Sequence, residues 1–215
     1  MRKRIASIAV VLTLIINMLT FTAEAALPVL PENTAYARLD KKVESVNIKE
    51  VTMGEGVDPV YDSKMGYCSW MLDVSDSTRY DIYVDLDDSF AYNVDDGSTF
   101  DIEIEYYSQG STFFNVHYDC ETQVDRLAKI VYVGKNENWE KVNFTLDDAL
   151  FANRIKDKYD LRLTALMAFA RSQNQPATVD VLIKSIKVTR NAAAQPIKHY
   201  GWTDVNGNVF EWFND

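Results

Sequence analysis

The chain has 215 residues, of which 47% are hydrophobic and 25% are charged. This length and composition are typical of one domain with a substantial core, which excludes a largely disordered protein. The formal net charge is −10, and so acidic a surface repels phosphate backbones, which argues against nucleic acid as a partner.

The N-terminus has the pattern of a secretory signal peptide. Basic residues at positions 2–4 precede an apolar run over residues 5–21, and residues 23–25 read Ala-Glu-Ala, an A-x-A cleavage pattern. Cleavage there removes three basic residues and one acidic residue and leaves a mature chain of charge −12. The alternative is an uncleaved anchor, and a second A-x-A at residues 35–37 leaves the exact site open. We therefore expect residues 1–25 to be a signal peptide of a secreted or cell-surface protein with no membrane attachment after cleavage.

The next residues lead into the folded part. Residues 26–41 are rich in Pro, Glu, Asn and Ala without a period, and we interpret them as a leader. A first strand is predicted over residues 43–51, because a Met-Gly-Glu-Gly turn follows it. A short aromatic strand is predicted over residues 67–73, before a polar Ser-Asp-Ser-Thr turn.

Three strands joined by polar turns are predicted within residues 80–119. Apolar and polar positions alternate along each of them, so one side of the pleat is apolar and the other acidic and aromatic. The predicted inward residues are Ile82, Val84, Leu86, Phe100, Ile102, Ile104, Tyr106, Phe114, Val116 and Tyr118. A hairpin that sets Tyr107 opposite Phe113 would keep all three strands in register. We therefore expect one core face and one decorated outer face.

Further strands are predicted over residues 127–133, 139–146, 161–170 and 178–189. In the last of these the apolar parity changes, which indicates a bend or bulge. Residues 147–152 are predicted to form one short helical turn capped by an aspartate. Eight or nine strands without a longer helical pattern predict an all-β fold, an antiparallel jelly-roll β-sandwich over residues 42–191.

The last residues, 192–215, are predicted to be a linker followed by an aromatic hairpin. Asn206-Gly207 between two valines is a strong hairpin signal. The aromatic residues there are Tyr200, Trp202, Phe210, Trp212 and Phe213. A lone hairpin is marginal in water, so these rings need either the sandwich or a partner protein to cover them.

The two cysteines, Cys68 and Cys120, are both in the secreted part of the chain. An oxidising compartment permits one disulfide between them, and two buried thiols are the alternative. The spacing matches no C-x-x-C motif and no zinc site.

Residues 80–190 resemble the galactose-binding-like jelly-roll modules, similar to carbohydrate-binding modules, that accompany glycoside hydrolase domains in secreting bacteria. The matching pieces are YVDLDDSFAYNVDDGSTFDIEIEYY, NVHYD, WEKVNFTLDDALFANR, DLRLTA and VLIKSIKV. The resemblance implies a β-sandwich of carbohydrate-binding architecture, and related modules often carry a structural calcium ion. It identifies no ligand, and it does not reach the aromatic tail.

The decorated face offers groups that bind sugars. An aromatic ring stacks on the C–H face of a sugar while planar polar groups bind its hydroxyls. The candidate carbohydrate-binding residues are Trp70, Tyr83, Glu103, Glu105, Tyr107, Phe113, Asn115 and His117. An ordinary solvated face is the alternative interpretation, and loop aromatics such as Tyr67 and Tyr92 are a competing location. We interpret Trp139 as a core or rim residue.

Two other chemistries are considered. Aspartates in the turns, Asp85, Asp87, Asp88, Asp95 and Asp96, could bind calcium, although solvated turn residues are the favoured interpretation. Asp101, Glu103 and Glu105 share a strand face, and side chains two residues apart on a strand could reach the roughly 5–5.5 Å separation of the carboxyl pair in a retaining glycosidase. Their order, Asp-Glu-Glu, differs from the Glu-Asp-Glu of the laminarinase-type glucanases they resemble. The sequence therefore favours a secreted, non-catalytic module that binds polysaccharide, with a structural or protein-interaction domain as the alternative and a glycoside hydrolase using Glu103 and Glu105 as the least favoured reading.

Overall fold

The computed structural model describes residues 27, 29–54, 56–108, 110–135, 137–169, 173–176, 179–192, 200–203 and 209–212. The chain divides into two compact units, Met1–Leu30 and Pro31–Asp215, and every element below belongs to the second. The predicted signal peptide lies outside the described residues. Within them, no helix is long and apolar enough to cross a membrane.

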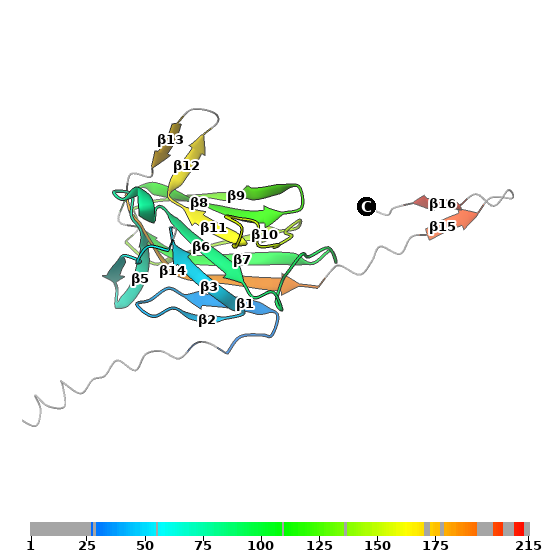
Figure 1. Ribbon diagram of the computed structural model, residues 1–215, viewed down its shortest axis with the longest axis horizontal. Coiled ribbons are helices and arrows are strands. Elements are labelled where there is room, and N and C mark those ends of the chain that lie inside the picture. The colour runs from blue at the N-terminus through cyan, green and yellow to red at the C-terminus, as the bar shows by residue number, and fades with distance from the viewer. Residues whose placement is uncertain are drawn as a thin grey trace, which may run out of the picture. The chain divides into compact units, whose positions relative to one another are not determined.

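Two antiparallel sheets form a β-sandwich, which confirms the predicted fold class (Figure 1). Sheet A consists of β1 (Thr34–Arg38), β2 (Glu44–Val46), β4 (Tyr61–Lys64), β5 (Tyr67–Leu72), β7 (Thr99–Ser108), β10 (Glu140–Leu146) and β14 (Val181–Asn191). Its order is β10-β7-β14-β1-β2, with β5 also on β14 and β4 on β5. Sheet B consists, in spatial order, of β3 (Ile48–Met53), β6 (Asp81–Leu86), β11 (Leu161–Thr164), β8 (Thr112–Cys120) and β9 (Gln123–Val133). A 3-10 helix, η1 (Ser77–Arg79), precedes β6.

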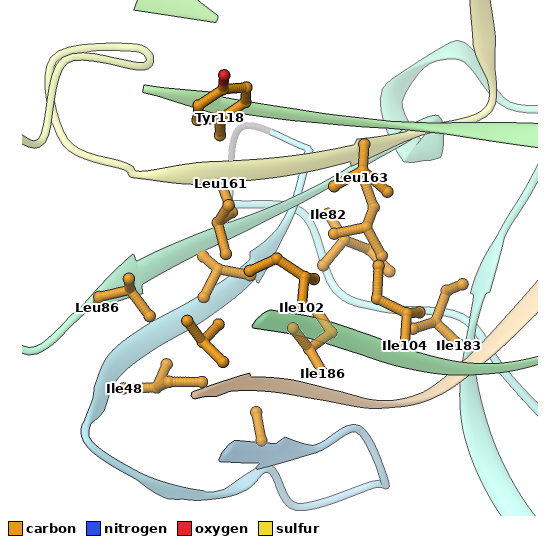
Figure 2. Close-up of a cluster of buried hydrophobic side chains, with 14 of the residues drawn as sticks. Ile48, Ile82, Leu86, Ile102, Ile104, Tyr118, Leu161, Leu163, Ile183 and Ile186 are labelled. Carbon is orange, nitrogen blue, oxygen red and sulfur yellow. The ribbon is translucent and has the colours of Figure 1, made fainter. Parts of the chain in front are cut away.

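The core lies between the sheets and is made by the predicted inward residues, all of which are buried. Figure 2 shows Ile82, Leu86 and Leu163 from sheet B facing Ile102 and Ile104 from sheet A. Because side chains alternate across a strand, an apolar residue at every second position commits that face to the core. The inward and outward assignments for β6, β7 and β8 are therefore confirmed.

The predicted pairing of the central strands is wrong. Tyr107 lies opposite Leu182 of β14, and Phe113 lies opposite Tyr132 of β9. Consecutive strands β7 and β8 thus belong to different sheets, with their apolar sides facing each other across the core. Alternation of apolar residues determines which side of a strand faces the core. It does not determine whether two such strands are neighbours in one sheet or lie in two sheets that face each other.

The N-terminal strands also differ from expectation. Residues 34–38, expected in the leader, form β1, whose Ala35 and Ala37 are buried; alanine is a weak strand signal, which explains why the sequence did not reveal it. The strand predicted over residues 43–51 is divided at Asn47. This residue has φ 54°, a left-handed conformation that asparagine tolerates, and the chain passes there from sheet A to sheet B.

No helical turn forms over residues 147–152. Phe151 and Asn153 have positive φ values of 50° and 58°, which are not right-handed helical. The segment is instead held by β8, since the buried Asp119 carboxylate accepts from the amide of Ala152 at 2.9 Å. A side-chain acceptor on a neighbouring strand replaces the local cap that the sequence predicted.

The remaining strands form two hairpins. The strand predicted over residues 161–170 is divided at Ala165 into β11 and β12 (Leu166–Phe169), which pairs with β13 (Gln173–Pro176). The C-terminal hairpin is confirmed as β15 (Tyr200–Thr203) with β16 (Val209–Trp212). Its Asn-Gly turn lies outside the described residues. The bulge expected in the last long strand is confirmed between Ile183 and Ser185 of β14.

Phe114 tests how strongly the two sheets depend on each other. It is fully buried on β8, and its ring meets that of Tyr106 on β7 edge-on at 5.2 Å. We expect Phe114→Ala to lower the free energy of unfolding by about 3–5 kcal/mol, because it leaves a cavity between the sheets. Urea unfolding measures this, with Phe113→Ala, a half-buried ring on the other side of β8, as the matched control. Equal losses in the two variants would contradict the assignment.

Candidate functional site

The structure divides the predicted sugar-binding residues between three places. Glu103, Glu105 and Tyr107 lie on the outer face of sheet A, because they are the outward positions of β7. The outward positions of β6 and β8, Tyr83, Phe113, Asn115 and His117, lie on the outer face of sheet B, on the opposite side of the sandwich. Trp70 is buried in the core, where its indole nitrogen donates to the carbonyl of Asp40 at 2.9 Å.

The outer face of sheet A carries a lattice of ion pairs. Glu103 lies opposite Asn143 on β10 and Lys187 on β14. Its carboxylate is 2.8 Å from Lys141 Nζ and 3.9 Å from Lys187 Nζ. Glu105 is paired with Lys184 at 2.7 Å. Positive groups from both neighbouring strands thus balance the acidic side of β7.

A groove crosses this face over β10, β7 and β14. It has a volume of about 430 Å³ and is open to solvent. The residues that line it are Asp101, Ile102, Glu103, Asn143, Phe144, Thr145, Lys187 and Thr189. Carboxylate, amide, hydroxyl and ammonium groups in one groove supply both donors and acceptors to a ligand rich in hydroxyls.

An aromatic cluster lies farther along β7 on the same face. Trp139 meets the ring of Tyr67 edge-on at 6.0 Å and lies 5.5 Å from the ring of Tyr107. Tyr67 is 49% exposed, whereas Tyr107 is buried beneath the cluster. The sequence placed Trp139 in the core or at its rim, because nothing local shows that strands β5, β7 and β10 converge here.

The outer face of sheet B is closed around His117 and Tyr83. Arg162 donates to both oxygens of Asp125, at 2.9 and 2.6 Å, and its guanidinium also reaches Asp81. His117 lies beneath this network, and its Nδ1 donates to the carbonyl of Asp125 at 3.0 Å. Burial lowers the pKa of His117, and the nearby arginine lowers it further. Tyr83 is covered by the stacked ring of Tyr159 at 5.0 Å.

A row of buried carboxylates crosses one end of sheet B. Asp85, Asp160 and Asp119 are each fully buried. Asp160 accepts from the amides of Leu86 and Asn153 at 3.0 Å. Burial raises the pKa of Asp160 to about 7, and the carboxylates of Asp85 and Asp119 add to the rise. Lys49 is 3.1 Å from the carboxylate of Asp85.

Four of the five aspartates considered for calcium, Asp85, Asp87, Asp88 and Asp96, have other partners. Asp87 accepts from the amide of Ser89 at 2.8 Å, and Asp96 from the amide of Ser98 at 2.9 Å. In the described part of the chain, no three His, Cys, Asp or Glu side chains are grouped so that they could hold a metal ion. These turns therefore offer no preformed metal centre.

The cysteines are not bonded to each other. Cys68 lies on β5 of sheet A, and Cys120 is buried at the end of β8 in sheet B, and both are free thiols. The disulfide that the sequence left open is thus not formed in this structure.

No protein-family model and no curated protein matches the chain. Similar solved structures include a family 29 carbohydrate-binding module from Piromyces equi, 14% identical with a TM-score of 0.39, over 73% of this chain and 91% of that chain. Another holds the CBM22-1 and GH10 modules of endo-1,4-β-D-xylanase 10B from Clostridium thermocellum, complexed with xylohexaose (14% identity, TM-score 0.37, 73% of this chain and 26% of that one). A CBM4 structure is 8% identical with a TM-score of 0.34, over 76% of this chain and 94% of that one. Likeness at this level identifies no ligand for this chain.

Asp160 makes the stability of the protein depend on pH. Its folded-state pKa of about 7 exceeds the ordinary 3.8, so the folded state holds a proton that the unfolded chain releases. The free energy of unfolding should therefore fall as pH rises through this window, by roughly 2–3 kcal/mol between pH 5 and pH 7 from this group, and level off above pH 7. His117 acts in the opposite sense, since its lowered pKa makes stability fall as pH drops below its ordinary 6.5.

Comparison with Asp160→Asn isolates this contribution. Urea unfolding at pH 5, 6, 7 and 8 should give a flatter or reversed slope in the variant, whatever its stability at pH 7. Asp95→Asn, at an exposed turn position, is the matched control and should keep the wild-type slope. Parallel curves for the wild type and Asp160→Asn would show that Asp160 titrates normally.

Proposed function

We propose that the protein is a non-catalytic module that binds a polysaccharide on the outer face of sheet A. One observation carries the proposal. A polar groove containing Glu103 and Asn143 shares this face with an aromatic cluster around Trp139. A sugar needs both kinds of surface, a ring to stack on and planar polar groups for its hydroxyls.

The spacing of the two parts fits an extended chain. Outward residues on a strand repeat about every 6.6 Å, so Glu103, Glu105 and Tyr107 mark steps along β7 from the groove to the aromatic cluster. A ligand that covers both parts spans several sugar units. The exposed face of Tyr67 and the edge of Trp139 would contact one unit, and the groove would hold the next ones.

Binding without hydrolysis is favoured by the ion pairs on β7. A retaining glycosidase needs one carboxyl group that can give a proton to the glycosidic oxygen and a second that attacks the sugar. Glu103 and Glu105 are each paired with a lysine, Lys141 at 2.8 Å and Lys184 at 2.7 Å. Both side chains are thus engaged in ion pairs within the face of the sheet. With the predicted signal peptide, these features support a secreted module that binds polysaccharide outside the cell or at its surface.

An aromatic hairpin at the C-terminus carries the second candidate function, docking on a partner protein. Its register pairs Tyr200 with Trp212 and Trp202 with Phe210. In the described residues β15 and β16 pair only with each other. An isolated two-stranded hairpin is marginal in water, and a partner surface would stabilise it.

A glycan array with soluble and insoluble polysaccharides tests the proposed site. We expect Trp139→Ala and Glu103→Gln each to weaken binding about tenfold, roughly 1.4 kcal/mol, because one removes an aromatic contact and the other replaces a charged acceptor oxygen with an amide donor. Tyr132→Ala is the matched control, since Tyr132 is 70% exposed on the outer face of sheet B. Equal loss in Tyr132→Ala, or no binding by the folded wild type, would contradict the proposal.

A chain truncated after Gln195 separates the two candidate functions. We expect it to keep its melting temperature and its glycan binding, because the sandwich ends with β14 at Asn191. Loss of association with other proteins, measured by pull-down, would assign docking to the hairpin. Unfolding of the truncated chain would show instead that the hairpin is part of the sandwich.

A further inference from the structure

The bulge in β14 marks a junction in sheet A. On its N-terminal side, Val181–Ile183 pair with β5, and on its C-terminal side Ser185–Thr189 pair with β1. Lys184 lies between the two, and its carbonyl accepts from the amide of Leu39 at 2.8 Å. A bulge re-aims the side chain of the extra residue, and here it brings the side chain of Lys184 to the aromatic cluster on the outer face of sheet A.

The β4–β5 hairpin is held by the sheet along only part of its length. β5 pairs with β14 through Trp70–Leu72, whereas Tyr67 pairs only with Lys64 of its own hairpin. The turn between them contains Met65 and Gly66, both with positive φ. Since β1 occupies the edge of β14 beyond the bulge, no described strand pairs with this end of β5 from the sheet. The position of the Tyr67 ring must therefore come from its side-chain contacts.

Lys184 supplies the closest of these contacts. Its ammonium lies 3.5 Å from the centre of the Tyr67 ring and 5.3 Å from that of Trp139. The same group is 2.7 Å from the carboxylate of Glu105, and both side chains are mostly buried. A cation over an aromatic face is attracted more strongly when it is removed from water. One ammonium thus ties a ring of the β4–β5 hairpin to Glu105 of β7 and to Trp139, the residue before β10.

We propose that Lys184 is a positioning residue of the candidate glycan site, which fixes the Tyr67 ring against Trp139 where the backbone ladder no longer holds it. This inference rests on the proposed function for its effect on binding. Its structural half, the placement of the two rings, stands on the contacts alone. The ammonium covers one face of Tyr67, and a sugar would therefore stack on the other face.

The placement of the two rings is tested by acrylamide quenching of the fluorescence of Trp139. The signal of Trp139 is obtained by subtracting, for each variant, the fluorescence of the same protein carrying Trp139→Phe. Lys184→Met keeps the length of the stem and removes the charge. We expect it to release Tyr67 and to raise the quenching constant of Trp139 about twofold. Lys184→Arg should restore the wild-type value, because a guanidinium also stacks on an aromatic face. Lys141→Met, which removes the lysine at Glu103, is the matched control and should leave the quenching constant unchanged.

The functional half is tested by titrating the same variants with the best glycan from the array. We expect Lys184→Met to weaken binding about fivefold, the size of one lost cation–π contact, and Lys184→Arg to restore it within twofold. Unchanged quenching in Lys184→Met, or no rescue by Lys184→Arg, would overturn the inference. If Lys184→Met fails to fold because Glu105 is left unpaired, the double variant Glu105→Gln/Lys184→Met takes its place, and its quenching constant tests the inference. A wild type that binds no glycan would refute the proposed function, and the quenching data would still decide the role of Lys184.

Discussion

The packing of β7 against β8 across the core is the constraint on which the rest of the structure depends. The two strands are consecutive in the chain, yet their rings of Tyr106 and Phe114 meet from opposite sheets. Once the apolar positions of both strands are buried against each other, their alternate positions must point to opposite outsides of the sandwich. The acidic face of β7 and the polar face of β8 thereby become two separate surfaces.

These two surfaces differ in how open they are to a ligand. On sheet B, loop residues close the polar face, since Tyr159 covers Tyr83 and backbone amides of the 152–154 segment bind the carboxylates of Asp119 and Asp160. Buried carboxylates of this kind order a loop, and a raised pKa such as that of Asp160 is the consequence of their burial. On sheet A the outward groups remain in an open groove, where they can meet a ligand.

The bulge in β14 links the architecture of sheet A to its candidate site. It lets β14 pair with β5 at one end and with β1 at the other. The same irregularity aims the ammonium of Lys184 into the aromatic cluster. Because Ile183 and Ile186 both face the core, the extra residue at the bulge leaves two consecutive side chains, Lys184 and Ser185, on the outer side of sheet A. The bulge therefore coincides with the change of partner strand from β5 to β1, and it places the ammonium of Lys184 between the rings beside the groove.

The sequence by itself determined which residues of β6, β7 and β8 face the core, where β14 changes parity, and that the fold is an all-β sandwich, because side-chain alternation is a local property of the chain. It also identified Glu103, Glu105 and Tyr107 as outward groups. Only the tertiary structure decided that Tyr83, Asn115 and His117 lie on the opposite side, and that Trp139 joins Tyr67 and Tyr107 in one cluster. Which strands share a sheet depends on pairings between residues distant in sequence, and alternation within a strand carries no information about its neighbours.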